Sequence, residues 1–447
     1  MILDHRDLRG VFRRLALPLA VQMLGDQLLG VADTIAIGAL GTEALAGATA
    51  ATTVVIALIS LVAGFWSGTS ILAAQRIGAR DVDGFARAVR AGALAPLLAA
   101  AVLAIASVPL AGPSIHALVG SLPSAPAAAQ YLVLRCISLI PMAISGTLIT
   151  GLGAAGNRTL GVIVLALINT VHIPLLLVLA LGWGTHHPFG IAGAGVSSLL
   201  SETIAAIHAA IYVARRPVYR IFSSWAIDAT TAMRCAVLGA PESVFMLAVM
   251  GPDIAIVRML APLGPLAVAG FRALTVVSDL TFVIPSPLQY AMQVVIGQRL
   301  GAGDVAGARR FFTRARRAAL VVTALEGAAI AVLARPLAFL FTLDARVAAS
   351  AALPLALHMV TMPVKGWAMA SLAPIRAAGD TRFSMLVGIL SGLLVLPLVW
   401  LALARLHVGL YAVPIAWIVA WSARAAVTDA ELARNRWWRR GTLLSTA

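Results

Sequence analysis

The sequence predicts an all-α membrane protein with twelve transmembrane helices, arranged as two parallel-repeat bundles of six. Of its 447 residues, 61% are hydrophobic and only 11% are charged, with a mean hydropathy of +0.96. A soluble domain has roughly 25% charged residues. Apolar runs of about 20 residues, enough to span the hydrocarbon core as helices, recur along the whole chain. The second half of the chain also repeats the first at a constant spacing.

The repeat is visible at three separate landmarks. The similar pairs are residues 75–82 and 298–305, 40–47 and 263–270, and 154–157 and 377–380. Because all three keep one spacing, the chain consists of two homologous halves of about 220 residues each. Internal repeats in a hydrophobic chain are typical of secondary transporters, which move one half against the other around a central site.

Six apolar runs fall in each half. We expect spans at 14–38, 45–74, 88–110, 127–153, 159–182, 191–214, 232–260, 266–297, 312–341, 348–375, 382–405 and 411–432. These define an N-terminal lobe at 1–214, a cytoplasmic linker at 215–231, and a C-terminal lobe with a basic tail at 232–447. The runs are continuous and rich in Ala and Leu, unlike the alternating ten-residue segments of a membrane barrel.

Arginine is distributed unevenly between the two sides of the membrane. With the N-terminus inside, the even-numbered connections and both terminal segments carry 25 arginines. The odd-numbered connections carry only Arg258, Arg335, Arg346 and Arg405. This bias places both termini in the cytoplasm. Since six helices per half is an even number, both halves start inside and the repeat is parallel, not inverted.

The net charge of +15 is explained by these arginines, so no nucleic-acid partner is predicted. They lie beside spans, where positive-inside topology and anionic lipid account for them. Neither Cys136 nor Cys235 belongs to a metal or disulfide motif. Walker, HExxH and GxSxG motifs are absent, so we expect no enzyme activity and no cofactor. Transport is then passive or driven by an ion gradient.

Several of these segments resemble the multidrug and toxic compound extrusion (MATE) family. In the first half they are Ala32-Asp33-Thr34, Leu40-Gly41, Ala44-Leu45-Ala46-Gly47, Gln75-Arg76-Ile77-Gly78-Ala79 and Gly190-Ile191-Ala192-Gly193-Ala194; in the second they are Ala261-Pro262-Leu263-Gly264, Gly297-Gln298-Arg299-Leu300-Gly301-Ala302-Gly303-Asp304 and Arg376-Ala377-Ala378-Gly379-Asp380-Thr381-Arg382. The resemblance covers nearly the whole chain. It implies two six-helix bundles around a central cavity, and export of organic cations or other amphipathic compounds against inward H⁺ or Na⁺.

Asp33 matches the aspartate that the family uses for cation coupling in the N-terminal half. Charged side chains inside a bilayer face a cavity or a partner, because exposing them to lipid is costly. We expect Asp33 to lie within reach of Asn169 or of the hydroxyl groups of the sixth helix, which include Ser198. A hydrogen-bonded acid that only stabilises the helix is the alternative.

The fifth helix departs from the family pattern Asn-x-x-x-Asp-Pro. This chain has Asn169 and Pro174, but Ile173 replaces the acid and His172 precedes it. One carboxylate holds Na⁺ less well than two, since hard cations prefer several oxygen ligands. This favours H⁺ over Na⁺. Histidine is suited to exchanging protons near neutral pH, although a neutral histidine bonded to a carbonyl is an equally good interpretation.

The second half carries its own intramembrane charges. Asp253 lies one turn beyond a position where related transporters have an acid, and Asp279 and Arg272 lie two turns apart on one helix face. Lys365 is the only lysine and falls where related transporters have an aspartate. We expect it to face the cavity and to pair with Asp253 or Asp279, or to bind an anionic substrate; a snorkelling lysine at the lipid interface is the alternative.

Further residues are candidates for the substrate cavity. Asp26 and Glu202 are intramembrane acids in the first and sixth helices, and Met292 and Trp367 could line a drug pocket or simply pack between helices. A major-facilitator transporter also has two parallel halves, but residues 78–84 do not match its loop motif. A lipid-linked oligosaccharide flippase of the same superfamily is the closer rival. We expect a monomer in the bacterial plasma membrane that contacts lipid and a small-molecule substrate.

Overall fold

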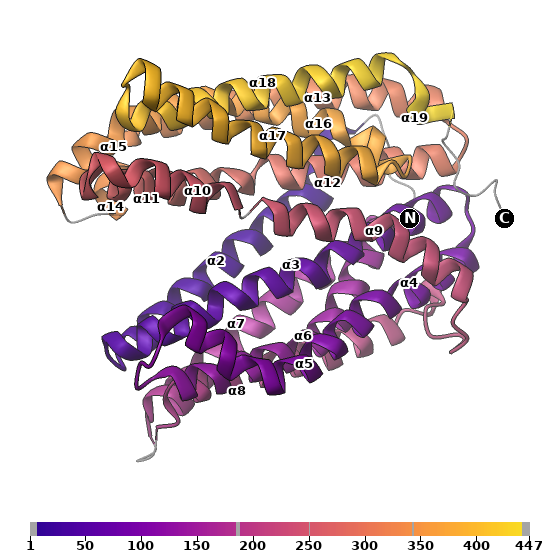
Figure 1. Ribbon diagram of the computed structural model, residues 1–447. Coiled ribbons are helices and arrows are strands. Elements are labelled where there is room, and N and C mark those ends of the chain that lie inside the picture. Colours follow the sequence, from indigo (N-terminus) through magenta and orange to yellow (C-terminus); the bar gives the residue numbers. More distant parts are fainter. Residues whose placement is uncertain (1–6, 185–187, 250, 342–343, 440–447) are drawn as a thin grey trace. The chain divides into compact units, whose positions relative to one another are not determined.

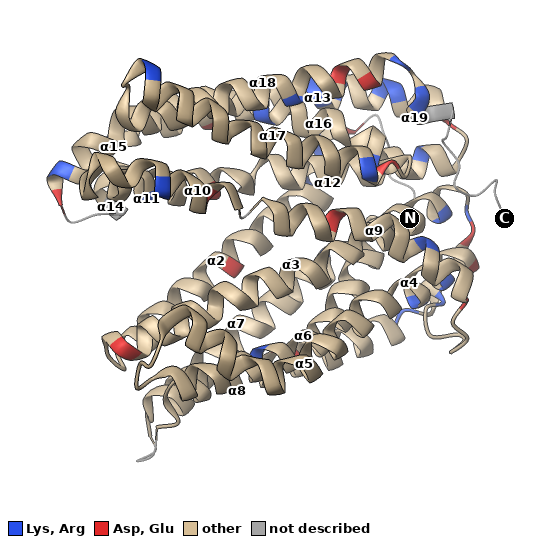
Figure 2. Ribbon diagram, in the orientation of Figure 1, with Lys and Arg blue, Asp and Glu red and all other residues tan. Residues whose placement is uncertain are grey.

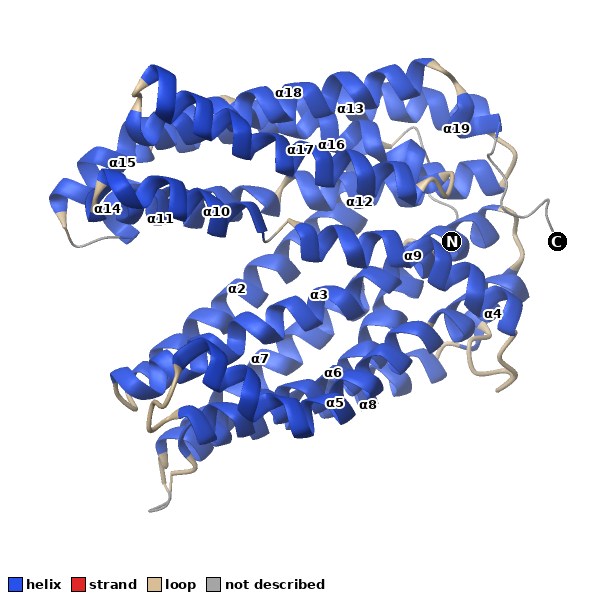
Figure 3. Cartoon of the chain, viewed as in Figure 1, coloured by secondary structure: helices blue, strands red, loops and turns tan. Residues whose placement is uncertain are grey.

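The structure, a computed structural model, describes residues 7–184, 188–249, 251–341 and 344–439. This part of the chain is built from helices and contains no strand (Figure 3). Its contacts divide the chain into two compact units (Figure 1). Unit 1 runs from Leu17 to Met246, and unit 2 combines the described residues before Leu17 with those from Leu247 onward.

Unit 1 contains the six spans of the first half and one further helix. Its helices are α2 (Leu17–Gly38), α3 (Thr42–Gly78), α4 (Val82–Gly92), α5 (Leu94–Val119), α6 (Ala125–Ala154), α7 (Thr159–Leu181), α8 (Gly190–Ala214) and most of α9 (Ala229–Ala248). The two largest apolar clusters of its interior lie around Phe85 and Leu152 and around Ile115 and Tyr131, and a smaller one lies around Val62 and Leu139.

Unit 2 contains the rest of the second half and the short N-terminal helix. Its helices are α1 (Leu8–Val11), α10 (Gly251–Leu260), α11 (Pro265–Leu280), α12 (Pro285–Gly301), α13 (Val305–Val332), α14 (Ala334–Phe341), α15 (Ala345–His358), α16 (Thr361–Ala377), α17 (Thr381–Leu401), α18 (Ala412–Ala433) and α19 (Arg436–Arg439). Leu15, just after α1, is fully buried in a cluster with Val295 and Phe311.

Ten helical segments of the described chain are long and apolar enough to cross a membrane, and eleven if the bent pair α15 and α16 forms one span. The remaining predicted span is α13, which is 28 residues long. Five arginines in its first half and Glu326 in its second make it more charged than the others. Its length still suffices to cross the hydrocarbon core, because a helix rises by about 1.5 Å per residue.

The strongest motif of the repeat folds into the same turn in both units. Arg76 Nη1 lies 2.8 Å from Asp81 Oδ2, and at the equivalent place Arg299 Nη1 lies 3.3 Å from Asp304 Oδ2. Each aspartate also caps the following helix, by accepting a hydrogen bond from the backbone N–H three residues further on. The motif is therefore explained by helix capping in a polar turn.

Helix α9 packs tightly on α3, although by sequence it starts the second half. A β-carbon added at Gly68 would lie 2.0 Å from the backbone oxygen of Cys235, and one at Gly64 would lie 2.3 Å from the backbone nitrogen of Ser243. The glycines let the two backbones approach closely. Unit 1 therefore extends past the predicted lobe boundary at 214, through the predicted linker, into the seventh span.

The predicted linker at 215–231 is bound to unit 1 by specific contacts. The Tyr219 ring lies 6.1 Å from that of Phe85, and the Tyr219 hydroxyl accepts a hydrogen bond from Asn157 at 3.3 Å. Arg90 donates to the carbonyl oxygen of Ile221 at 2.9 Å. This segment is thus a packed part of unit 1.

Candidate functional site

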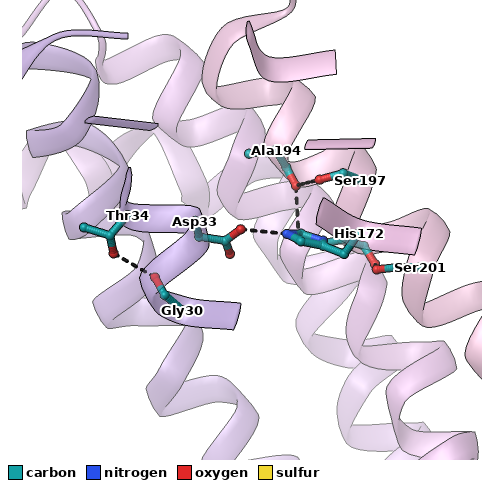
Figure 4. Close-up of polar contacts among 8 residues, drawn as sticks. Gly30, Asp33, Thr34, His172, Ala194, Ser197 and Ser201 are labelled. Atoms are coloured by element: carbon teal, nitrogen blue, oxygen red, sulfur yellow. Dashed lines mark hydrogen bonds and ion pairs between the residues drawn. The ribbon is translucent and has the colours of Figure 1, made fainter. Parts of the chain in front are cut away.

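The polar centre of unit 1 is a contact between α2 and α7. Asp33 Oδ1 and His172 Nε2 lie 2.6 Å apart (Figure 4). The His172 side chain is 2% exposed and that of Asp33 is 22% exposed. A short contact between a carboxylate and an imidazole is a strong hydrogen bond, and an ion pair when the imidazole is protonated. The pair therefore joins α2 and α7 through a contact between two titratable side chains.

The partner of Asp33 differs from the one that the sequence predicted. Asn169 donates to the backbone oxygen of Leu165 at 2.9 Å, one turn back on its own helix. Ser198 is buried and donates to the backbone oxygen of Ala194 at 3.1 Å, also within its own helix. The hydrogen-bond partner of Asp33 is instead His172, whose side chain points from α7 toward α2 (Figure 4).

A second set of charges in unit 1 surrounds Glu202. Its charged neighbours, near enough for direct electrostatic interaction, are Arg135, Asp26 and His172. Asp26 is exposed on α2, whereas Glu202 Oε2 and Arg135 Nε are buried and have no hydrogen-bond partner. Arg135 is not among the site residues predicted from the sequence, because the arginine bias was judged from the connections between spans and Arg135 lies inside a span. A lone arginine within the run 127–153 was the signal that could have identified it.

Lys365 lies inside unit 2, where 1% of its surface is exposed. Its Nζ donates to Thr281 Oγ1 at 3.0 Å and lies 3.7 Å from the centre of the Phe282 ring. Glu326 and Asp279 are its acidic electrostatic neighbours. The ammonium is thus held by a hydroxyl, an aromatic face and nearby negative charge. This burial gives no support to an anion-binding role.

The remaining polar candidates of unit 2 lie near one another. Asp253, Asp279 and Arg272 are exposed on α10 and α11, and Asp279 and Arg272 are the charged neighbours of Asp253. Met292, in contrast, is 3% exposed in an apolar core cluster of α12.

Trp367 takes part in a network that the sequence did not predict. Its Nε1 donates to Asp429 Oδ2 at 2.7 Å, and Asp429 Oδ1 accepts from Arg316 at 2.7 Å and from Ser371 at 3.0 Å. The guanidinium of Arg316 lies 3.8 Å from the centre of the Trp367 ring. Three helices, α13, α16 and α18, meet at this carboxylate. Asp429 lies near the end of the last span, and no motif in the sequence indicated these partners.

Two helical bundles of duplicated sequence, with charged groups buried inside each, define a membrane transporter of the two-lobe class. Comparison with known families identifies the family within this class. The MatE family model matches residues 18–178 and again 241–401. The chain therefore belongs to the multidrug and toxic compound extrusion family, whose members are transporters and not enzymes. The two matches begin at residues 18 and 241, which is the spacing of the sequence repeat.

Named relatives extend along most of the chain. It is 28% identical over 344 residues to the probable multidrug resistance protein NorM of Aromatoleum aromaticum, covering 75% of this chain and 73% of the relative. It is 26% identical over 392 residues to the multidrug resistance protein PmpM of Pseudomonas aeruginosa, covering 83% and 79%.

Solved structures show the same fold. A MATE crystal structure in the bent conformation superposes with a TM-score of 0.88 at 20% identity, covering 98% of this chain and 99% of that one. A structure from Pyrococcus furiosus, described as a MOP superfamily transporter with a binding pocket of reverse polarity, superposes with a TM-score of 0.87 at 20% identity, covering 97% of this chain and 96% of that one. The predicted fold, twelve transmembrane helices in two parallel-repeat bundles, is confirmed.

Proposed function

We propose that this transporter exports organic cations or other amphipathic small molecules by alternating access, in exchange for protons that move inward. Relatives named as multidrug resistance proteins support the substrate class. The observation that carries proton coupling is the 2.6 Å contact between Asp33 and His172. It brings together two titratable groups of different helices in the first lobe, a buried histidine and a half-buried aspartate.

The contact suggests how proton binding is linked to movement. With one proton between them, the pair is an ion pair that ties α2 to α7. A second proton neutralises the Asp33 carboxylate, removes the charge attraction and weakens this tie. A ligand shifts a conformational equilibrium only by binding one state better than the other. The difference in strength of the α2–α7 contact with and without the second proton is therefore what coupling requires. Release of the proton to the cytoplasm restores the ion pair.

The surroundings of Asp33 favour H⁺ over Na⁺ as the coupling ion. Sodium would need several oxygen ligands at this point. The partner of the carboxylate at 2.6 Å is a ring nitrogen of His172 and not an oxygen.

The proposal also places the protein as a monomer in a bacterial plasma membrane, with one end of each helical unit facing the cytoplasm. In each unit, charged residues gather toward one end of the helices, near α4 in unit 1 and near α19 in unit 2 (Figure 2). These are the ends that the arginine bias assigns to the cytoplasm. Both termini then lie inside.

Flux into proteoliposomes tests this function. We expect a pH gradient to drive transport of ethidium, used here as a lipophilic cation, and an equal Na⁺ gradient to drive none. Asp33→Asn should reduce pH-driven flux to that of protein-free liposomes, since an amide cannot bind and release the proton.

Thr34→Val is the matched control. Thr34 is exposed next to Asp33, and its hydroxyl donates only to Gly30 of its own helix, at 2.8 Å (Figure 4). This variant should transport like the wild type. Wild-type flux in the Asp33→Asn protein, or flux driven equally well by Na⁺, would overturn the proposal.

A further inference from the structure

Glu202 of α8 has an environment that the Asp33–His172 pair does not explain. Its Oε2 is buried without a hydrogen-bond partner, and so is the Nε of Arg135 on α6. Charged groups with unsatisfied polar atoms inside a helical bundle in a membrane are costly, and those that occur there usually serve a function.

The packing of α8 directs Glu202 toward the interior of unit 1. A β-carbon at Gly195 would lie 2.9 Å from Leu134, so this face of α8 rests on α6. Glu202 follows Gly195 by seven residues, or about two turns, and lies on nearly the same face. The charged and titratable groups of the helices packed against it are Arg135 of α6, His172 of α7, and Asp26 and Asp33 of α2.

The charges of this cluster do not balance at a single proton. It has three carboxyl groups, one permanently charged arginine and one histidine. One proton shared by Asp33 and His172 leaves a net negative charge, because only Arg135 opposes Glu202 and Asp26. A second proton makes the cluster neutral. Since a low-dielectric interior disfavours net charge, we place the added proton, while Asp33 and His172 still form an ion pair, on the more buried of the other two carboxyls, which is Glu202 and not the exposed Asp26.

We propose that Glu202 is a second proton-binding group of the first lobe, which takes up and releases one proton per transport cycle next to the Asp33–His172 pair. An O–H bond forms at the carboxylate when a proton arrives from the outer side, and breaks when the proton leaves to the cytoplasm. Arg135 is a positioning residue: it supplies the positive charge that ionised Glu202 needs inside the membrane. This inference rests on the proposed proton coupling.

Infrared difference spectroscopy of the purified full chain in lipid tests it directly, because a protonated carboxyl has its own C=O stretching band. Spectra are recorded between buffers on either side of neutral pH. We expect Glu202→Gln to remove one band that Asp33→Asn leaves in place. Glu43→Gln, the same change at an exposed position of the same lobe, should leave the near-neutral bands unchanged.

Arg135 provides a second test that keeps Glu202 itself intact. Arg135→Gln should leave Glu202 protonated in both buffers, so that its band no longer changes with pH. Arg135→Lys, which keeps the charge, should retain the change. In proteoliposomes, Glu202→Gln should move about half as many protons per ethidium as the wild type, because a glutamine side chain binds no proton.

The outcomes separate this inference from the proposed function. If the band persists in Glu202→Gln and its proton count equals that of the wild type, the role of Glu202 is overturned, even where Asp33→Asn abolishes transport. If Asp33→Asn transports normally while the Glu202 band behaves as expected, the assignment of Asp33 fails and Glu202 remains a proton site.

Discussion

Substituting Gly68 tests the close packing that joins α9 to unit 1. A β-carbon at this position would lie 2.0 Å from the backbone oxygen of Cys235 and 2.9 Å from the backbone nitrogen of Gly239. Ordinary contact begins at 3.4 Å, so α3 and α9 would have to separate by about 1.4 Å. Overpacking of this kind costs about 1–3 kcal/mol. Since the opposing atoms are backbone and cannot rotate away, we expect the upper part of that range.

The gain in helix propensity from Gly to Ala, up to about 1 kcal/mol, offsets part of this cost. Gly68→Ala should therefore lower the free energy of unfolding by about 2 kcal/mol. The matched control is Gly112→Ala in α5, where a β-carbon meets nothing within 4 Å and should stabilise slightly. Equilibrium unfolding in mixed micelles, followed by circular dichroism, measures both. If Gly68→Ala is as stable as Gly112→Ala, the packing argument is wrong.

Two further predictions concern unit 2. Lys365→Met keeps the side-chain volume but removes the positive charge near Glu326. It should lower the free energy of unfolding by about 2–3 kcal/mol, which is less than the ~3–5 kcal/mol lost when a pair in direct contact is broken. Adding Glu326→Gln should restore most of this loss, and a double variant no more stable than Lys365→Met would contradict an interaction between the two residues. Asp429→Asn weakens the hydrogen bonds from Arg316 and Trp367 and should cost about 1.5–3 kcal/mol in the same assay. Glu431→Gln removes the charge of a single pair with the exposed Arg434 and should cost less than about 1 kcal/mol; equal losses would argue against the network.

The sequence was sufficient for the architecture because the signals for it are local or periodic. Apolar run length predicts a span wherever the run lies, and the constant spacing of the repeat predicts two equivalent bundles without knowledge of any contact. The approach of α9 to α3 depends on tertiary packing, although the pair Gly64 and Gly68, four residues apart, was a readable signal for close helix contact.

The partners of the site residues were harder to predict. Which side chain of α7 meets Asp33 depends on the rotation of that helix, and a change of one residue turns a side chain by about 100°. Asn169 and His172 are three residues apart and lie on neighbouring faces. Sequence alone identified both as candidates but could not choose between them. The pairing of Lys365 with a hydroxyl and an aromatic ring depends in the same way on how the short segment Thr281–Val283, between α11 and α12, packs on α16.

The repeat itself supplies an argument for placing proton exchange in the first lobe. At the spacing that relates the two family matches, the counterparts of Asp33 and His172 in unit 2 are Ile256 and Val395. Both are fully buried and belong to one apolar core cluster. The same two positions of the fold therefore hold a titratable pair in one lobe and hydrocarbon packing in the other. Because an apolar contact is indifferent to protons, the proposed coupling through the α2–α7 contact has no equivalent at these two positions of unit 2. Two lobes that respond differently to one proton gradient are what an alternating transporter needs if proton binding is to bias its movement in one direction.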